Sequence, residues 1–408
     1  MDHGSGIPPY QPPIPDAAAI ATLRHALLGD GALIDRIAAL PRDAAIAALC
    51  ELAAASGTAV APEALVQFLR PDPLGLDRLA LRAVTGDHPP SEQWLPVGLG
   101  TDGAQAVVEW AHFAGAPLDD PFFEYPLRKA RQHPVSRLLA WRTPLERLAL
   151  AGEAGEAVLD GLVFHMSRCG STLVAQALGA MPGHLVLSEP APFDDLLQFC
   201  TARADLPLET RVALLRGMAA ALASERGAPV RRRFLKTDCW HAGALPLLRA
   251  AFPETPWIFL YRDPVEVLMS HERMPGGQTL PGPHAAMVGI AEPGARPGLD
   301  FAARVLAAIC HRAADHAGIG GGMLIDYAQL PEAFLTRILP HFGIMPDAAD
   351  AECIAQALRR DAKQPHQSFD PHQRPPRQRA SAAVIAASDR HLAPAVARLR
   401  ALATRIGD

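Results

Sequence analysis

Six consecutive residues, Ser-Arg-Cys-Gly-Ser-Thr, have the types and spacing that an anion-binding turn requires. The apolar run VLDGLVFHM precedes them and the helical pattern STLVAQALGAM follows. Gly170 lets the backbone approach a phosphate closely. The amides of Gly170, Ser171 and Thr172 would open the helix, where unpaired N–H groups and the helix dipole attract an anion. Arg168 adds a fixed positive charge, so the segment, which includes Cys169, predicts a phosphate-binding loop.

This loop departs from the GxxxxGK[ST] pattern that binds Mg-ATP. The pattern requires Lys where Ser171 stands and Gly where His165 stands. Without that lysine, a phosphate donor that needs no metal fits the loop better. For this segment taken alone, the alternative is an ordinary polar turn between a strand and a helix, with Cys169 as a packed thiol.

A second candidate anion site lies in the segment PWIFLYRDPVEVLMSH. Arg262 ends an apolar run, and Asp263 and Pro264 are residue types that begin helices. Ser270 follows Arg262 by eight residues, which places it about two turns into the predicted helix. Arg262 and Ser270 could therefore converge on one anion. The alternative is a salt-bridged arginine at a strand end and a solvent-facing serine.

Five short apolar runs alternate with helical patterns from about residue 157 onward. The runs are VLDGLVFHM, HLVLSE, RRRFLKT, PWIFLYR and GMLIDY. This alternation predicts βαβ units and an α/β fold, with a parallel five-stranded sheet of the P-loop type flanked by helices. Ligands bind at the carboxyl ends of such strands. The residues that follow each run are therefore the candidates for a functional site.

The chain before these runs has a different composition. Residues 1–16 contain five prolines and are expected to form a flexible tail. Residues 17–150 are rich in Ala and Leu with helical periodicity, and we expect a mainly helical N-terminal region of unknown role. The P-loop-type domain is expected to span residues 151–408.

Together, the two anion-binding segments resemble the sulfotransferase family that uses 3′-phosphoadenosine 5′-phosphosulfate (PAPS), in its bacterial type. SRCGST resembles the family's loop for the 5′-phosphosulfate, and YRDPVEVLMS resembles its 3′-phosphate segment. The match in order and spacing covers about residues 157–345. GMLIDYAQLPEAFLTRILPHFGI resembles the family's late strand, except that Ala328 stands where an acidic residue usually follows the tyrosine. The resemblance implies a transferase with PAPS as co-substrate and no metal.

The resemblance also implies roles for individual residues. Arg168 would stabilise charge on the bridging oxygen and the sulfuryl group, while Arg262 and Ser270 would hold the 3′-phosphate. Lys363 falls where the family often closes a loop over the nucleotide, although a solvated surface lysine is the alternative. Like phosphoryl transfer, in-line sulfuryl transfer depends more on positioned charge than on covalent catalysis.

Three candidates for the base that takes the acceptor proton follow the predicted strands. Glu189 ranks first, because carboxylate bases occur after this strand in parts of the family. Lys236 and Asp238 resemble the family's Lys-Thr-His segment, with Asp in place of the His base. Lys236 would stabilise the leaving group, position the acceptor, or form an ion pair with Asp238. His241 could act with Asp238 as an oriented pair, since a helix beginning near residue 239 places both on one face.

Composition narrows the class of protein further. The 408 residues are 49% hydrophobic and 20% charged, which is typical of a globular protein, and the net charge of -5 disfavours nucleic acid as a partner. Six scattered cysteines without a CxxC pair predict neither a zinc site nor a disulfide framework. With no signal-peptide pattern and no run of 18 apolar residues, we expect a cytoplasmic protein without a membrane span. Its acceptor would be a small molecule, glycan or lipid bearing a hydroxyl or amine.

Two other functions remain open at this point. A kinase-like P-loop phosphotransferase would use the same sheet, but the loop lacks its lysine. A non-catalytic nucleotide-binding module is allowed by the long N-terminal region, and it would bind a nucleotide without turnover.

Overall fold

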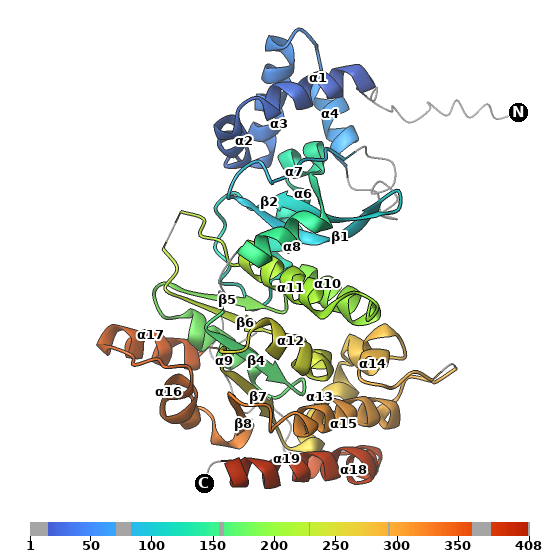
Figure 1. Ribbon diagram of the computed structural model, residues 1–408, viewed down its shortest axis with the longest axis vertical. Helices are drawn as coiled ribbons and strands as arrows, with labels where there is room; N and C mark the ends of the chain where they lie inside the picture. Colours follow the sequence, from blue (N-terminus) through green and yellow to red (C-terminus); the bar gives the residue numbers. More distant parts are fainter. Residues whose placement is uncertain are drawn as a thin grey trace, which may run out of the picture. The chain divides into compact units, whose positions relative to one another are not determined.

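The computed structural model describes residues 15–70, 83–154, 159–227, 229–292, 294–360 and 377–406 (Figure 1). They fold as two compact units. The first comprises Met1–Ala116 and Tyr125–Arg147, and the second comprises Pro117–Glu124 and Leu148–Asp408.

The first unit combines short helices with a small antiparallel sheet of order β1-β2-β3. Asp16 and Asp30 cap the first two helices, because their carboxylates accept hydrogen bonds from backbone N–H groups of the first turn. The helical periodicity of residues 17–150 did not indicate this sheet. The elements are α1 (Ala17–Leu28), α2 (Gly31–Ala38), α3 (Arg42–Ala55), α4 (Pro62–Leu69), β1 (Trp94–Asp102), β2 (Gln105–His112), α6 (Glu124–Gln132), α7 (Pro134–Leu139) and β3 (Arg142–Pro144).

The second unit is built on a parallel sheet of five strands, in the order β5-β6-β4-β7-β8. Each strand lies inside one of the five apolar runs, so the predicted α/β fold is confirmed. All residues of β4 and β7 are buried, as expected for central strands with helices on both faces. The strands are β4 (Gly161–His165), β5 (His184–Ser188), β6 (Arg232–Lys236), β7 (Trp257–Tyr261) and β8 (Gly322–Asp326).

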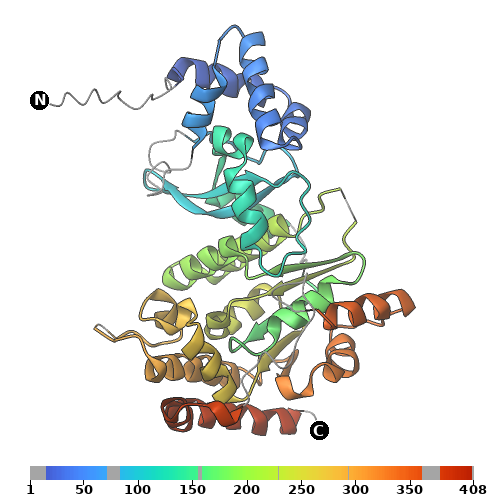
Figure 2. The ribbon, with the colours of Figure 1, turned by 180° about the vertical axis from the view of Figure 1, so that it is seen from behind.

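Helices cover both faces of this sheet: α9 and α17 lie on one side, and α12 and α15 on the other (Figures 1 and 2). The helical elements are α8 (Leu145–Ala154), α9 (Ser171–Gly179), α10 (Ala191–Ala202), α11 (Leu208–Leu222), η1 (Cys239–Ala244), α12 (Leu245–Ala251), α13 (Pro264–Arg273), η2 (Gly277–Thr279), α14 (Pro283–Met287), α15 (Leu299–Asp315), η3 (Tyr327–Gln329), η4 (Phe334–Ile338), α16 (Leu339–His341), α17 (Ala348–Leu358), η6 (Arg377–Arg379), α18 (Ala382–Ala387), η7 (Ser388–Leu392) and α19 (Ala393–Ile406).

Strand order and register bring the predicted site segments to one edge of the sheet. β4 lies between β6 and β7, with Val163 opposite Lys236 and His165 opposite Leu260. Because all five strands are parallel, the chain leaves each of them at the same edge. The loop after β4, the segment after β6 and Arg262 after β7 therefore emerge side by side.

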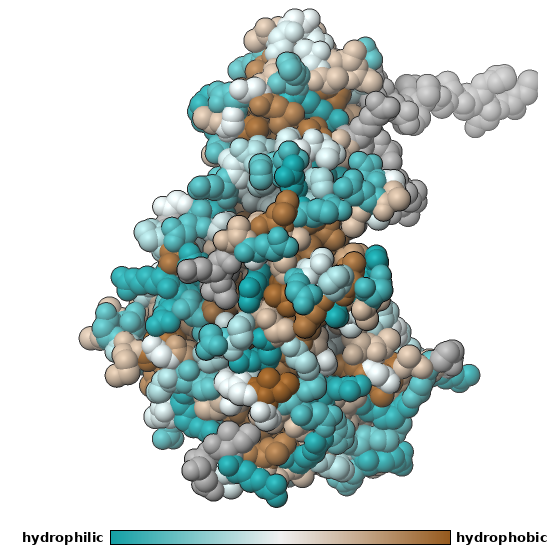
Figure 3. All heavy atoms as spheres, viewed as in Figure 1, coloured by the Kyte–Doolittle hydropathy of each residue, from teal (hydrophilic) through white to brown (hydrophobic). Residues whose placement is uncertain are grey.

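On the face drawn in Figure 3, hydrophobic residues are scattered among hydrophilic ones. Met345 and Met274 are two of the large apolar side chains that remain exposed, at 88% and 61%. Isolated groups of this kind are usual on folded proteins.

In the described part of the chain, no single helix has both the length and the apolar character needed to cross a membrane. α1 and α2 meet that test only jointly, as a pair bent by 105°.

Candidate functional site

The loop between β4 and α9 has an unusual backbone. Ser167, Arg168 and Gly170 all have left-handed conformations, with φ of 78°, 53° and 88°, and α9 begins at Ser171 as predicted. Non-glycine residues are held in this region only where the surrounding structure enforces it, and such positions cluster at functional sites. A turn of this kind directs successive N–H groups inward and forms a concave anion site.

Side chains from other segments hold the start of this loop. The Ser167 hydroxyl accepts a hydrogen bond from Gln278 Nε2 at 2.9 Å and lies 3.4 Å from His271 Nε2. The backbone N–H of Ser167 donates to His165 Nδ1 at 3.1 Å. His165 is the last residue of β4. These contacts fix the loop in position before any ligand arrives.

Arg168 and Cys169 have opposite environments within the loop. The Arg168 side chain is half-buried and donates from Nη2 to the carbonyl oxygen of Met274 at 3.1 Å. Burial and the neighbouring charge of Arg273 lower the pKa of Arg168, and Glu189 acts in the opposite direction. The Cys169 thiol is fully buried and donates to the carbonyl oxygen of Leu260 at 3.2 Å. Burial raises the pKa of Cys169 to about 11, so this residue remains a packed thiol.

Arg262 extends from the end of β7 toward the same loop. Its Nη1 lies 3.5 Å from the carbonyl oxygen of Arg168, while Nε donates to Glu266 at 2.7 Å and Nη2 contacts the same carboxylate. Asp263 caps α13 as predicted, because its side chain accepts from the N–H groups of Val265 and Glu266. The salt-bridged arginine that the sequence left open is thus present. Arg262 and Glu266 are four residues apart in the sequence. Their ion pair leaves the Nη1 atom of Arg262 directed at the loop.

Ser270 lies within α13 and is half-buried. No contact between Ser270 and Arg262 is recorded in the ranges that the structure describes. Their convergence on one anion therefore remains a prediction. The predicted nucleotide-closing residue, Lys363, lies outside the described residues.

Lys236 at the end of β6 is completely buried, and its ammonium group contacts the Glu189 carboxylate. His165 Nε2 lies 3.2 Å from the same carboxylate oxygen, and the Phe122 ring centroid lies 5.3 Å from the ammonium. The predicted alternative, an ion pair between Lys236 and Asp238, is wrong because the partner is Glu189. Glu189 has φ of 52°, and this left-handed residue brings its side chain back over the strand ends.

Two opposing influences set the charge of Glu189. Burial raises the pKa of this carboxyl, but the adjacent Lys236 ammonium and the hydrogen bond from His165 outweigh burial and bring the pKa well below its usual range. Glu189 is therefore an ionised, fully engaged carboxylate. A carboxylate with a lowered pKa is a weak proton acceptor near neutral pH, which counts against its first rank among the candidate bases.

The Lys236→Met substitution is expected to destabilise the protein by about 3–5 kcal/mol, because it leaves the Glu189 charge buried without its partner. The loss should be largest near neutral pH. In the wild type, the lowered pKa of Glu189 contributes stability that is lost only as pH falls through that pKa. In the variant the carboxyl should favour its protonated form, so the deficit should shrink as pH falls toward about 4.

Urea unfolding at several pH values measures this effect. The double variant Lys236→Met with Glu189→Gln should recover most of the lost stability, because neither charge is then buried alone. A deficit that is equal at pH 4 and pH 7, or no recovery in the double variant, would contradict the assignment.

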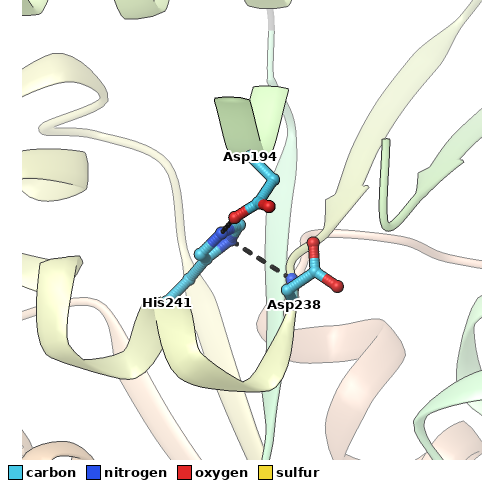
Figure 4. A group of neighbouring side chains, drawn as sticks. All are labelled: Asp194, Asp238 and His241. Carbon is cyan, nitrogen blue, oxygen red and sulfur yellow. Dashed lines mark hydrogen bonds and ion pairs between the residues drawn. The ribbon is translucent and has the colours of Figure 1, made fainter. Parts of the chain in front are cut away.

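The carboxylate that orients His241 is Asp194 on α10, a residue that sequence analysis did not identify (Figure 4). Asp194 Oδ1 lies 2.7 Å from His241 Nε2 and accepts from Trp240 Nε1 at 2.8 Å; Oδ2 accepts from Gln198 at 2.7 Å. Burial raises the pKa of Asp194, but these donors, with His241 first, bring it below its usual value. The predicted orientation of His241 by the Asp238 carboxyl is therefore wrong.

His241 has no free ring nitrogen with which to take a proton. Its Nδ1 accepts a hydrogen bond from the backbone N–H of Asp238 at 3.2 Å, so the proton of the neutral ring is on Nε2 and is directed at Asp194. In Figure 4 the dashed line from Asp238 starts at its backbone nitrogen and not at its carboxyl group. His241 therefore holds the backbone in place and is a poor candidate for the base.

Asp238 differs from the other carboxyl groups of the site. Asp238 is only 9% exposed, and its carboxyl forms the capping box at the start of η1 with the backbone N–H of His241. Burial, followed by the negative charges of Glu189 and Asp194, raises the pKa of Asp238 well above its ordinary value, with Lys236 opposing. Among the candidate bases, Asp238 is the carboxyl whose pKa is raised, and within the described residues no side chain donates a hydrogen bond to it.

The ligand atoms of Asp194, Asp238 and His241 lie within 4.8 Å of one another, close enough to suggest a cation site. Their hydrogen bonds argue against it. Asp194 is engaged by three donors, both nitrogens of His241 are occupied, and the Asp238 carboxyl takes part in the capping box of η1. The residues present do not fit a metal ion without breaking this network.

No model of a known protein family matches the chain, and no curated protein matches it. Among solved structures, the chain is similar to the sulfotransferase STF1 from Mycobacterium tuberculosis H37Rv, with 15% identity over 54% of this chain and 77% of that one, and a TM-score of 0.34. It is similar to the sulfotransferase STF9 from Mycobacterium avium, with 13% identity, 59% and 76% coverage and a TM-score of 0.36. A sulfotransferase from Alicyclobacillus acidocaldarius is 16% identical, with 61% and 97% coverage and a TM-score of 0.36. Likeness of this size does not carry an activity from one chain to another.

Proposed function

We propose that the chain transfers the sulfuryl group of PAPS to a hydroxyl or amine acceptor. One observation carries the proposal: the left-handed loop at residues 167–170 lies between two cationic side chains at the same edge of the sheet. Lys236 lies on the β6 side, and Arg262 reaches the loop from the β7 side. Both positive charges act on the Cys169 thiol in the middle of the loop.

This arrangement suits a donor with anionic groups at two places. The amides at the start of α9 would take the 5′-phosphosulfate, and Arg262 with Ser270 would take the 3′-phosphate. Arginine is suited to phosphate because its guanidinium offers several donors in a fixed plane. The loop has Ser171 where Mg-ATP loops have lysine, which is why a kinase-like reaction is less well supported.

In the proposed reaction, the acceptor oxygen or nitrogen attacks sulfur in line. A new bond forms from the acceptor atom to sulfur as the bond from sulfur to the bridging oxygen breaks, and adenosine 3′,5′-bisphosphate leaves. Arg168 and Lys236 would stabilise the charge that develops on the sulfuryl and bridging oxygens. The acceptor proton would go to Asp238, because Glu189 and His241 are both engaged.

Isothermal calorimetry in magnesium-free buffer provides the first test. We expect adenosine 3′,5′-bisphosphate to bind and Mg-ATP to bind far more weakly. A transfer assay with ³⁵S-labelled PAPS over phenols, sugars, lipids and amines then tests turnover. Tight Mg-ATP binding would favour the phosphotransferase, and nucleotide binding without transfer to any acceptor class would favour a non-catalytic module.

Arg262→Ala is expected to reduce the preference for PAPS over adenosine 5′-phosphosulfate by about ten- to a hundredfold, the usual effect of a charge-assisted hydrogen bond. The ratio of the two dissociation constants measures it. Arg398→Ala is a matched control, since that arginine forms an exposed pair with Asp315. A variant at 262 that discriminates as the wild type does would remove Arg262 from the donor site.

A further inference from the structure

Tyr327 lies between the two proposed anion-binding elements and contacts both. The guanidinium carbon of Arg262 lies 4.3 Å from the centre of the Tyr327 ring, which is a cation–π distance. The same ring lies against Gly170 so closely that a Cβ atom there would be 2.6 Å from its Cδ2. The side chain is half-buried and directly follows β8. One aromatic ring thus packs against the phosphate loop and against the arginine.

The remaining contacts of Arg262 explain why such packing matters. Its Nε and Nη2 are held by Glu266, and its Nη1 points to the carbonyl oxygen of Arg168. The guanidinium carbon lies over the Tyr327 ring, so the ring limits the movement of the side chain while Nη1 stays toward the loop. A free arginine side chain loses rotamer entropy when it is fixed. Here part of that ordering exists before the donor binds.

We propose that Tyr327 is a positioning residue that sets the spacing between the 5′- and 3′-phosphate sites by holding Arg262 against the loop. The ring acts through Arg262, and selectivity for a 3′-phosphorylated nucleotide depends on it. This inference rests on the proposed function, because it assumes that Arg262 binds the 3′-phosphate.

Calorimetric titration with two probes, adenosine 3′,5′-bisphosphate and 5′-AMP, tests the inference in Tyr327→Leu and Tyr327→Phe. The ratio of the two dissociation constants should fall about three- to tenfold in Tyr327→Leu, since cation–π contacts have this magnitude. Tyr327→Phe retains the ring and should keep the wild-type ratio. In an Arg262→Ala background, Tyr327→Leu should not change the ratio further.

A purely structural role of Tyr327 as support for Gly170 predicts a different result. Both probes would then bind more weakly by the same factor, and the ratio would not change. That result would overturn the inference. It would also be overturned if Tyr327→Leu changed neither the ratio nor the two affinities, or if Tyr327→Phe lowered the ratio as Tyr327→Leu does. A further fall of the ratio on adding Tyr327→Leu to Arg262→Ala would overturn it as well. If wild-type protein binds neither probe, the proposed function itself fails and the inference falls with it.

Discussion

Arg168→Ala is expected to lower turnover about a thousandfold while the affinity for adenosine 3′,5′-bisphosphate changes severalfold at most. In phosphoryl transfer, an arginine that stabilises the negative charge of the transition state increases the rate by about 10³–10⁵. Sulfuryl transfer also develops negative charge on the transferred group, so we expect an effect of similar size. The Arg168 side chain uses one of its donors on the Met274 carbonyl, which leaves others for the sulfuryl oxygens. Single-turnover rates with saturating PAPS measure the effect.

Arg273→Ala is the matched control for this experiment. Arg273 is an exposed cation whose charge acts on Arg168, so its removal changes the local potential but not the proposed contact. We expect its turnover to remain within about tenfold of the wild type. An Arg168→Ala protein with wild-type turnover, or one whose loss appears only in donor affinity, would exclude the residue from the chemical step.

Asp238→Asn is expected to reduce turnover about 10²–10⁴-fold, the usual contribution of a general base. The raised pKa of Asp238 means that the protonated form predominates at lower pH. The wild-type rate should therefore rise with pH as this carboxyl ionises, and the rising limb should disappear in the variant. The pH dependence of kcat/KM for both proteins measures it.

A measurement of the Tm of the Asp238→Asn variant distinguishes a loss of catalysis from a loss of folded protein. An ionised Asp238 is buried near Glu189 and Asp194, so replacing it with a neutral amide should leave the Tm unchanged or raise it. The same assay on Glu189→Gln tests the earlier ranking of the bases. If Glu189→Gln abolishes the rising limb and Asp238→Asn retains it, Glu189 is the base and the assignment made from the hydrogen bonds is wrong.

The five strands of the parallel sheet were predictable because each is a short apolar run between helical patterns. β4 and β7 are buried throughout, and a strand that is buried on both faces has a continuous run of hydrophobic residues. Such a run can be recognised without knowing which strands lie beside it. The start of α13 after Asp263 follows from local capping chemistry in the same way, and Gly170 marks the start of α9 at Ser171.

The small sheet of the first unit was missed although a local signal was present. Gly103 and Ala104 stand between β1 and β2, and Asp102 pairs with Gln105 across this two-residue turn. Glycine at the first position of such a turn is a recognised hairpin signal. β1 itself contains Pro96 and Gly98, where the register shifts. Proline and glycine are rare inside strands and mark bulges when they occur there, so the strand pattern was obscured.

Asp194 shows which part of the site could not be predicted from the sequence. Its position on the apolar face of α10, one turn from Leu197 and bonded to Gln198 four residues on, could have marked it as a buried polar group. Nothing in the sequence indicates that His241, 47 residues later, is its partner. The spacing pointed to Asp238 instead, because helical proximity is visible in a sequence and contact between separate elements is not.

The sequence by itself determined which segments carry the chemistry: a loop with glycine and hydroxyl residues after one strand, an arginine after another, and acidic and basic residues after the rest. Their types and the buried runs before them are local properties. The tertiary structure alone decided the pairing of charges, in which Lys236 contacts Glu189, Asp194 engages His241, and Asp238 is left with a raised pKa. The physical reason is that a buried charge depends on every group within a few ångströms, and strand order, not sequence distance, selects those groups.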